Sequence, residues 1–264
     1  MRPPQGHLAL TVGKLGSVKI AGALSDGTKV SGSAKLLDGL NAGGWLCIAL
    51  HKPLYSKKGF IGGLLWLDPD GGTLRVDTEY GWSVDWQCDD TKKEIKFARE
   101  LDILGGYFGT GKDIPLGPAV VRYMRFSADV PAADLPPAAA LTGGAWMSAA
   151  FPDIPATVTS GTITLAPADK PVKPAKGEPQ EYTYAGDNPS AAKLTYAPKT
   201  GHFKGTFKLY YDGTNDKGAL QHKTATVTYS GVMVPDGSGT RTGLGIGTTT
   251  VGKKKFGIPV FLSE

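Results

Sequence analysis

The sequence predicts an all-β fold, an antiparallel barrel or sandwich built from two related β-meander halves. Three observations lead to this prediction: apolar residues alternate with period two, Asp-Gly pairs recur along the chain, and one glycine-rich phrase occurs twice. The chain has 37 glycines in 264 residues, about twice the usual share of roughly 7%, which fits many short strands joined by tight turns. The glycines have no three-residue period, which excludes collagen.

Alternation with period two marks the individual strands. In residues 80–88 every second side chain is apolar or aromatic, and all of them fall on one side of an extended chain: Tyr80, Trp82, Val84, Trp86 and Cys88. A helix would distribute these side chains around its circumference, whereas a strand lines them up. We expect Trp82 and Trp86 to lie in the core, because large rings bury the most area.

One segment carries signals for both helix and strand. Residues 91–106, TKKEIKFARELDILGG, begin with the capping-box pair Thr91 and Glu94 and then alternate at Leu101 and Ile103. We expect a short helix or turn at the start of this segment and a strand by Leu101. Elsewhere Asp-Gly pairs favour type I′ hairpin turns, at residues 26–27, 38–39, 70–71, 212–213 and 236–237.

A repeated phrase predicts an internal duplication. Residues 57–71, KKGFIGGLLWLDPDG, match residues 199–213, KTGHFKGTFKLYYDG, without a gap and at a spacing of 142 residues. A weaker echo occurs in LGSVKIAGALSDG at residues 15–27, and Ser-Gly pairs follow two of the copies, at 31–32 and 230–231. Pairing of two such halves covers sheet edges that either half alone would expose. Chance similarity among glycine-rich strands is the alternative.

These observations divide the chain into three parts. We expect a first β half at residues 1–128, a Pro/Ala-rich connection with a short strand or loop at 129–160, and a second β half at 161–264. The halves are expected to pack as one unit. Proline removes donors from a sheet ladder, so the Pro-rich stretches 129–140 and 166–180 are predicted to be connections.

The charge distribution and the hydropathy of the sequence argue against two classes of partner, nucleic acid and membrane. The net charge is +5, but the lysines are scattered along the sequence and are not interleaved with aromatics as in a single-strand binder, so we expect no nucleic-acid partner. No apolar run approaches the roughly 20 residues of a membrane span, so none is expected. The first ten residues lack the apolar core of a signal peptide, and the immediate entry into a strand-like HLALTVG fits a segment of a longer chain.

The two cysteines leave two possibilities open. Cys47 and Cys88 each lie near a tryptophan in a strand-like run. In an oxidising compartment they would bridge neighbouring strands; otherwise they would be buried thiols that pack as small hydrophobes. We favour the buried thiols, because two cysteines carry no spacing information.

The phrases TGHFKGTFKL at residues 200–209 and SGVMVPDGSGTRTGLGIG at 230–247 resemble the glycine-rich β-repeat modules at the C-terminal ends of large secreted or surface bacterial proteins. The resemblance covers the last third of the chain and the phrase at residues 59–71. It implies an extracytoplasmic location, secreted or at the cell surface, and a structural or adhesive role. It transfers no functional residues.

Motifs of catalysis and ligand binding are incomplete. Residues 106–113, GYFGTGKD, follow the phosphate-loop pattern up to Lys112, but Asp113 replaces the magnesium-binding Ser or Thr and Pro115 interrupts the helix that the loop requires. Residues 237–247, GSGTRTGLGIG, are interpreted as strand and turn glycines. The histidines are dispersed and the Asp-Gly turns lack a full calcium-ligand set, so we expect no metal, no cofactor and no identifiable catalytic residue.

The sequence therefore predicts a non-enzymatic structural, adhesive or glycan-contacting module of a secreted or surface protein. Its partner would be a glycan or another surface protein, and the candidate ligand-binding residues are Trp146, Tyr210 and Tyr211, whose rings suit stacking on sugars. The alternative is a polysaccharide hydrolase that uses carboxylates near the tryptophan-rich strand, Asp85, Asp89 and Asp90.

Overall fold

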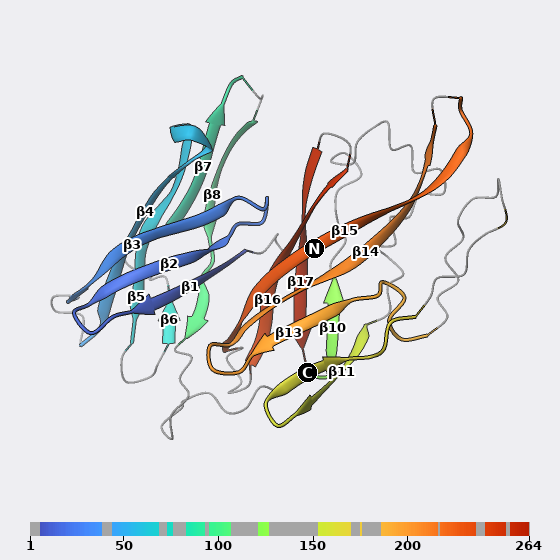
Figure 1. The fold of residues 1–264 in the computed structure, drawn as a ribbon. Coiled ribbons are helices and arrows are strands. Elements are labelled where there is room, and N and C mark those ends of the chain that lie inside the picture. Colours follow the sequence, from blue (N-terminus) through green and yellow to red (C-terminus); the bar gives the residue numbers. More distant parts are fainter. Residues whose placement is uncertain are drawn as a thin grey trace.

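The computed structural model is all-β and consists of two antiparallel sheets, which confirms the predicted fold class (Figure 1). It describes residues 6–38, 44–68, 73–75, 83–92, 95–106, 121–126, 153–169, 175, 186–215, 217–235, 241–251 and 254–263. In Figure 1 the sheet from the first part of the chain is blue to green, and the sheet from the second part is mostly orange to red.

The first sheet has nine strands and begins with a five-stranded meander. The meander comprises β1 (His7–Val12), β2 (Ser17–Ala23), β3 (Lys29–Asp38), β4 (Leu46–Leu54) and β5 (Gly59–Leu67). The strands that follow are β6 (Thr73–Arg75), β7 (Val84–Asp90), β8 (Ile95–Leu101) and β9 (Leu104–Gly106). The far edge of β5 pairs with both β6 and β7, β7 pairs with β8, and β6 pairs with β9.

The second sheet has eight strands in the order β12-β11-β10-β17-β16-β15-β14-β13. Its strands are β10 (Tyr123–Phe126), β11 (Ile154–Thr159), β12 (Thr162–Leu165), β13 (Lys193–Ala197), β14 (His202–Thr214), β15 (Leu220–Pro235), β16 (Arg241–Val251) and β17 (Lys254–Ser263). The edge strands β12 and β13 also contact each other, so this sheet nearly closes like a barrel. β10 belongs to this sheet although it lies within residues 1–128.

A buried asparagine holds the seam of the second sheet. Asn188 is fully buried, and its Nδ2 donates to the carbonyl of Ala166, just after β12, at 2.8 Å and to that of Ala192, just before β13, at 3.0 Å. Its Oδ1 accepts from the backbone N–H of Ala192 at 2.8 Å. One side chain therefore satisfies three backbone groups where the two edge strands meet.

The strand over residues 84–90 follows the predicted alternation. Val84, Trp86 and Cys88 are at most 3% exposed and share one face of β7, whereas Tyr80 and Trp82 lie outside the described residues. After a turn at Thr91–Lys92, the chain enters β8 at Ile95, so a strand replaces most of the capping-box segment. Pairing with β7 and a ring contact of 4.7 Å between Phe97 and Trp86 outweigh the local helix signal.

Each sheet curls around a core of its own. The first core is formed by side chains of β2, β3, β4, β5 and β7, including Val18, Ile48, Ile61, Leu65 and Trp86. The second core is formed by side chains of β10, β11, β12, β14, β15 and β17, including Phe203, Phe207, Val227, Tyr229 and Val260. The halves meet at a junction where β1 contacts β15 and β16, and where β9 contacts β15.

Glycines make room for aromatic rings in the second core. The ring of Phe203 lies over Gly231, Gly243 and Gly245, where an added Cβ would be 2.3–3.0 Å from a ring atom. Two of these glycines belong to the GLGIG phrase, which is part of β16. The phrase is thus a strand, as predicted, and its glycines serve packing.

The two copies of the repeated phrase both contain strands, β5 and β14, and their buried side chains agree at Ile61 with Phe203 and at Leu65 with Phe207. Their places differ, however, because β5 is the fifth strand of its meander and β14 is the second strand of the meander β13 to β17. The weaker echo, in β2, has the place that corresponds to β14. Duplication therefore stays a prediction.

Candidate functional site

The candidate stacking residues fall largely outside the described part of the chain. Trp146 lies outside the described residues. Tyr210 and Tyr211 belong to β14, where their backbones pair with Thr224 and Lys223, but their side chains are not among the described ones. The phosphate-loop-like phrase at residues 106–113 is described only at Gly106, the last residue of β9.

The carboxylates near the tryptophan-rich strand do not converge. Asp85 and Asp89 share the outward face of β7, four residues apart, which corresponds to about 13 Å along a strand. Asp90 is 4% exposed and lies on the opposite face, where it pairs with Lys58 at 2.6 Å. Glycosidase carboxyl pairs are about 5–9.5 Å apart, so this strand does not present such a pair.

The described residues contain neither a candidate metal site nor a disulfide. They contain no group of three or more His, Cys, Asp or Glu side chains that could hold a metal ion. Cys47 and Cys88 are both buried and free, as favoured from the sequence. They pair with opposite edges of β5, Cys47 with Trp66 and Cys88 with Gly59. The described residues likewise include no helix with the length and apolarity of a membrane span.

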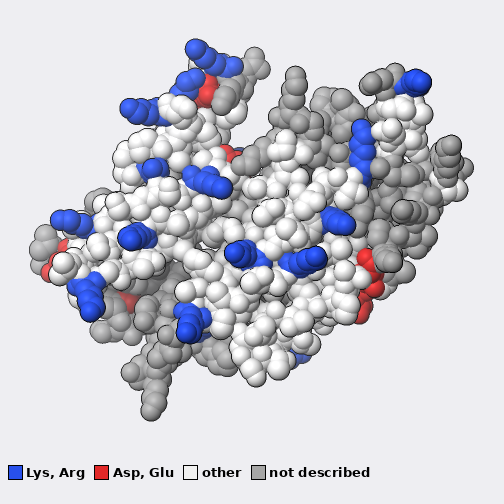
Figure 2. All heavy atoms as spheres, viewed as in Figure 1, with Lys and Arg blue, Asp and Glu red and all other residues white. Residues whose placement is uncertain are grey.

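Lysines that are scattered in the sequence gather on one face of the structure. Burial alternates along the strands, and six exposed lysines occupy outward positions: Lys19, Lys29 and Lys35 in the first sheet, and Lys193, Lys204 and Lys208 in the second. We call these six residues the lysine face. Figure 2 shows Lys and Arg side chains spread over both sheets, with few Asp and Glu among them.

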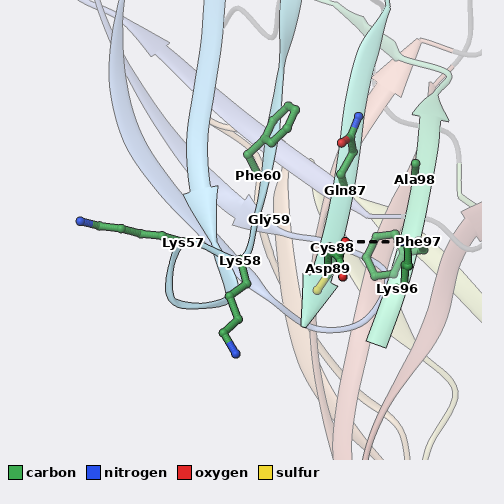
Figure 3. A pocket seen from close by; sticks show the side chains of 10 residues that line it. All are labelled: Lys57, Lys58, Gly59, Phe60, Gln87, Cys88, Asp89, Lys96, Phe97 and Ala98. Atoms are coloured by element: carbon green, nitrogen blue, oxygen red, sulfur yellow. Dashed lines mark ion pairs between the residues drawn. The ribbon is translucent and has the colours of Figure 1, made fainter. Parts of the chain in front are cut away.

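A separate hollow of about 420 Å³ lies on the first sheet, beside the turn between β4 and β5 (Figure 3). Phe60 of β5 and Gln87 of β7 are directly paired, and both line the hollow. Lys57 and Lys96 also belong to its lining, and the Lys96 ammonium is 3.5 Å from Asp89. The half-buried ring of Phe60 also contacts the ring of His51, with centroids 5.6 Å apart.

A strained turn supplies Lys57 to the lining of this hollow. Tyr55, Ser56 and Lys57 have φ values of 53°, 56° and 70°, in the left-handed region that non-glycine residues seldom occupy. Lys58, which follows the turn, anchors it to the end of β7: Asp89 donates its backbone N–H to the carbonyl of Lys58 at 2.8 Å, and the Lys58 ammonium pairs with Asp90.

The Tyr55 hydroxyl provides the second anchor. It donates to Asp26 at 2.6 Å and accepts from the indole N–H of Trp86 at 3.0 Å, so it links the β2–β3 turn to the core strand β7. Burial, followed by the hydrogen bond to Asp26, raises the pKa of the Tyr55 phenol. The group therefore stays protonated and acts as a structural donor. The sequence gives no signal for three successive left-handed residues, and so sequence reasoning missed the hollow.

No family model matches the chain, and no curated protein or solved structure gives a match. The function is therefore inferred from the geometry of the described residues.

Proposed function

We propose that this chain is a non-enzymatic, glycan-contacting module of a secreted or surface protein, and that the hollow beside Phe60 is its contact site. The observation that carries the proposal is the composition of the hollow, whose lining includes the ring of Phe60, the amide of Gln87 and the lysines Lys57 and Lys96. A sugar ring offers apolar C–H groups to an aromatic face and hydroxyls to amide and ammonium groups, so the two surfaces are complementary.

The position of these groups also favours binding. Phe60 and Gln87 lie on neighbouring strands of one sheet, and Lys57 belongs to the left-handed turn that precedes β5. A site on rigid strands with a fixed turn needs little reorganisation when a ligand binds, which lowers the entropic cost of association. The hydrolase alternative requires two carboxyl groups close enough to act as acid and base. The carboxylates of β7 are too far apart along the strand, or on opposite faces, to do so.

A glycan-array screen of the intact protein, followed by titration of each hit, tests the proposal. Phe60→Ala is expected to weaken binding at least about tenfold, because an apolar side chain covered by a ligand contributes about 1.5–3 kcal/mol. Tyr123→Ala is the matched control, since this exposed ring lies on the second sheet, away from the hollow. Release of reducing ends from a bound polysaccharide would favour the hydrolase. Absence of binding to every glycan would contradict the proposed contact and leave only a structural role.

A further inference from the structure

Charge is distributed unevenly between the parts of the chain. Residues 7–38 and 193–251, which supply β1 to β3 and β13 to β16, contain eleven Lys and Arg against five Asp and Glu. The rest of the chain contains eighteen against nineteen. The positive net charge of the protein therefore comes entirely from the segments that carry the lysine face.

Strand register brings the lysines of each sheet close together. In the second sheet Lys193 is opposite Thr206, so it is the diagonal neighbour of both Lys204 and Lys208. In the first sheet Lys19 is opposite Ser33, two residues from Lys35. Diagonal neighbours in a sheet are about 7–8 Å apart, a distance at which exposed like charges still repel.

The two groups of lysines are joined across the junction between the halves. Lys29 of β3 is opposite Ala23 of β2, which is in turn opposite His7 of β1. The Nε2 of His7 is 3.4 Å from the hydroxyl of Ser230 in β15. Ser230 in turn pairs with Lys204. One row of paired residues thus runs from β3 through β2, β1 and β15 to β14, with an exposed lysine at each end and the largely buried His7 at the junction.

None of the six lysines forms an ion pair with another described residue. By contrast, lysines near the hollow do have carboxylate partners, as Lys58 has Asp90 and Lys96 has Asp89. Self-repulsion without compensation destabilises the folded state slightly, and a bound polyanion would relieve it. This face is therefore complementary to a ligand with many negative charges.

The residues between the lysines indicate which polyanion fits. The outward neighbours are short hydroxyl side chains, among them Ser17, Ser31 and Ser33 in the first sheet and Thr195 and Thr228 in the second. Hydroxyls donate to and accept from sugar hydroxyls and acidic oxygens. The described outward positions of β2, β3, β13 and β15 hold no Phe, Tyr or Trp on which unstacked bases would stack.

We propose that the lysine face binds an acidic polysaccharide, a glycan chain bearing carboxylate or sulfate groups, across both halves of the molecule. This site is distinct from the hollow beside Phe60, and the inference stands whether or not the hollow binds a sugar. A linear polyanion that follows the row from Lys29 to Lys204 would contact both sheets at once, so it would also hold the halves together.

The test compares binding of the full chain to polygalacturonate, dextran sulfate and uncharged dextran in affinity electrophoresis. The variant combines Lys19→Glu, Lys35→Glu, Lys204→Glu and Lys208→Glu. Its matched control combines Lys14→Glu, Lys92→Glu, Lys199→Glu and Lys217→Glu, four exposed lysines that lie in turns and do not belong to the lysine face. A second version with Gln at the four positions keeps the test valid if the reversed charges reduce folding, which circular dichroism would show.

The expected result is binding to both acidic polymers and not to dextran, with affinity falling steeply as salt rises from about 50 to 200 mM. The Glu variant should weaken binding more than about tenfold, because a lysine near an anionic surface contributes about 1 kcal/mol. The control and Phe60→Ala should stay within about twofold of the native protein. Equal losses in variant and control, or binding to duplex DNA but to neither acidic glycan, would overturn the proposal.

Discussion

The ring of Phe203 lies so close to Gly231 that a Cβ atom added at Gly231 would be 2.3 Å from Cζ of the ring and 2.5 Å from the carbonyl oxygen of Leu244. Gly32 has the same sequence context, a Ser-Gly pair in the third strand of a five-stranded segment, but an added Cβ there would meet only the Cδ of Lys52, at 4.0 Å. Two positions that look alike in the sequence therefore differ in how much room they have.

Gly231→Ala is expected to lower the free energy of unfolding by about 2 kcal/mol or more, because the ring and the backbone must both shift to admit a methyl group. Gly32→Ala is the matched control and should change stability by less than about 1 kcal/mol, in the stabilising direction, since alanine restricts the unfolded chain. Urea denaturation followed by circular dichroism, which reports on the strands of both sheets, measures both changes. Equal effects at the two positions would contradict the packing described for Phe203.

Asn188→Ala is expected to destabilise the second sheet by about 3 kcal/mol, because it leaves the carbonyls of Ala166 and Ala192 and the N–H of Ala192 without their buried partner. Asn215→Ala is the control. Its Oδ1 also accepts two backbone N–H bonds, from Lys217 and Ala219, but in an exposed turn where water replaces them. That change should cost about 1 kcal/mol or less, and a larger loss than at Asn188 would refute the role assigned to the seam.

Much of the fold could be predicted from the sequence, because period-two alternation depends on each strand alone. Val84, Trp86 and Cys88 share a buried face for this reason. The segment at Ile95 shows the limit of such reasoning. A capping box is a local signal, whereas the pairing of β8 with β7 depends on residues that only the folded chain brings together.

The candidate sites were less predictable for the same reason. Lys19 and Lys35 look isolated in the sequence, and so do Lys193 and Lys204, since only the register of neighbouring strands places each pair side by side. The pairing of Phe60 with Gln87 likewise joins residues 27 positions apart. The sequence-based candidates were Trp146 in a loop-like run and Tyr210 and Tyr211 ahead of a turn, and no sequence signal distinguishes Phe60, a ring on a strand that follows a left-handed turn.

Cys47 and Cys88 are expected to remain reduced in the native protein even under an oxidant. Their partners on β5, Trp66 and Gly59, are seven residues apart, about 23 Å along the strand, and a disulfide requires Cα atoms within about 7 Å. Burial also raises the pKa of the Cys88 thiol, so little thiolate forms. Ellman's reagent should react slowly before urea is added and with both thiols afterwards. A disulfide within the folded monomer, found by mass spectrometry, would contradict this arrangement.

The junction between the halves should weaken in mild acid because of His7. Burial, and then the nearby positive charge of His202, lower the pKa of His7 from 6.5 to about 4. Its Nδ1 is buried and has no hydrogen-bond partner among the described residues, so protonation has no compensating acceptor there. Between about pH 6.5 and about pH 4 the unfolded chain binds a proton at this position and the folded chain does not.

The free energy of unfolding should therefore fall as the pH falls through this range, by up to about 3 kcal/mol from His7, and level off below it. Urea denaturation of the native protein and of His7→Gln at a series of pH values isolates this contribution, since both proteins share all other titrating groups. The variant should lose less stability across the range, whereas His51→Gln, a change at an exposed histidine, should follow the native protein. Parallel curves for the native protein and His7→Gln would mean that His7 is solvated and that the two sheets do not close over it.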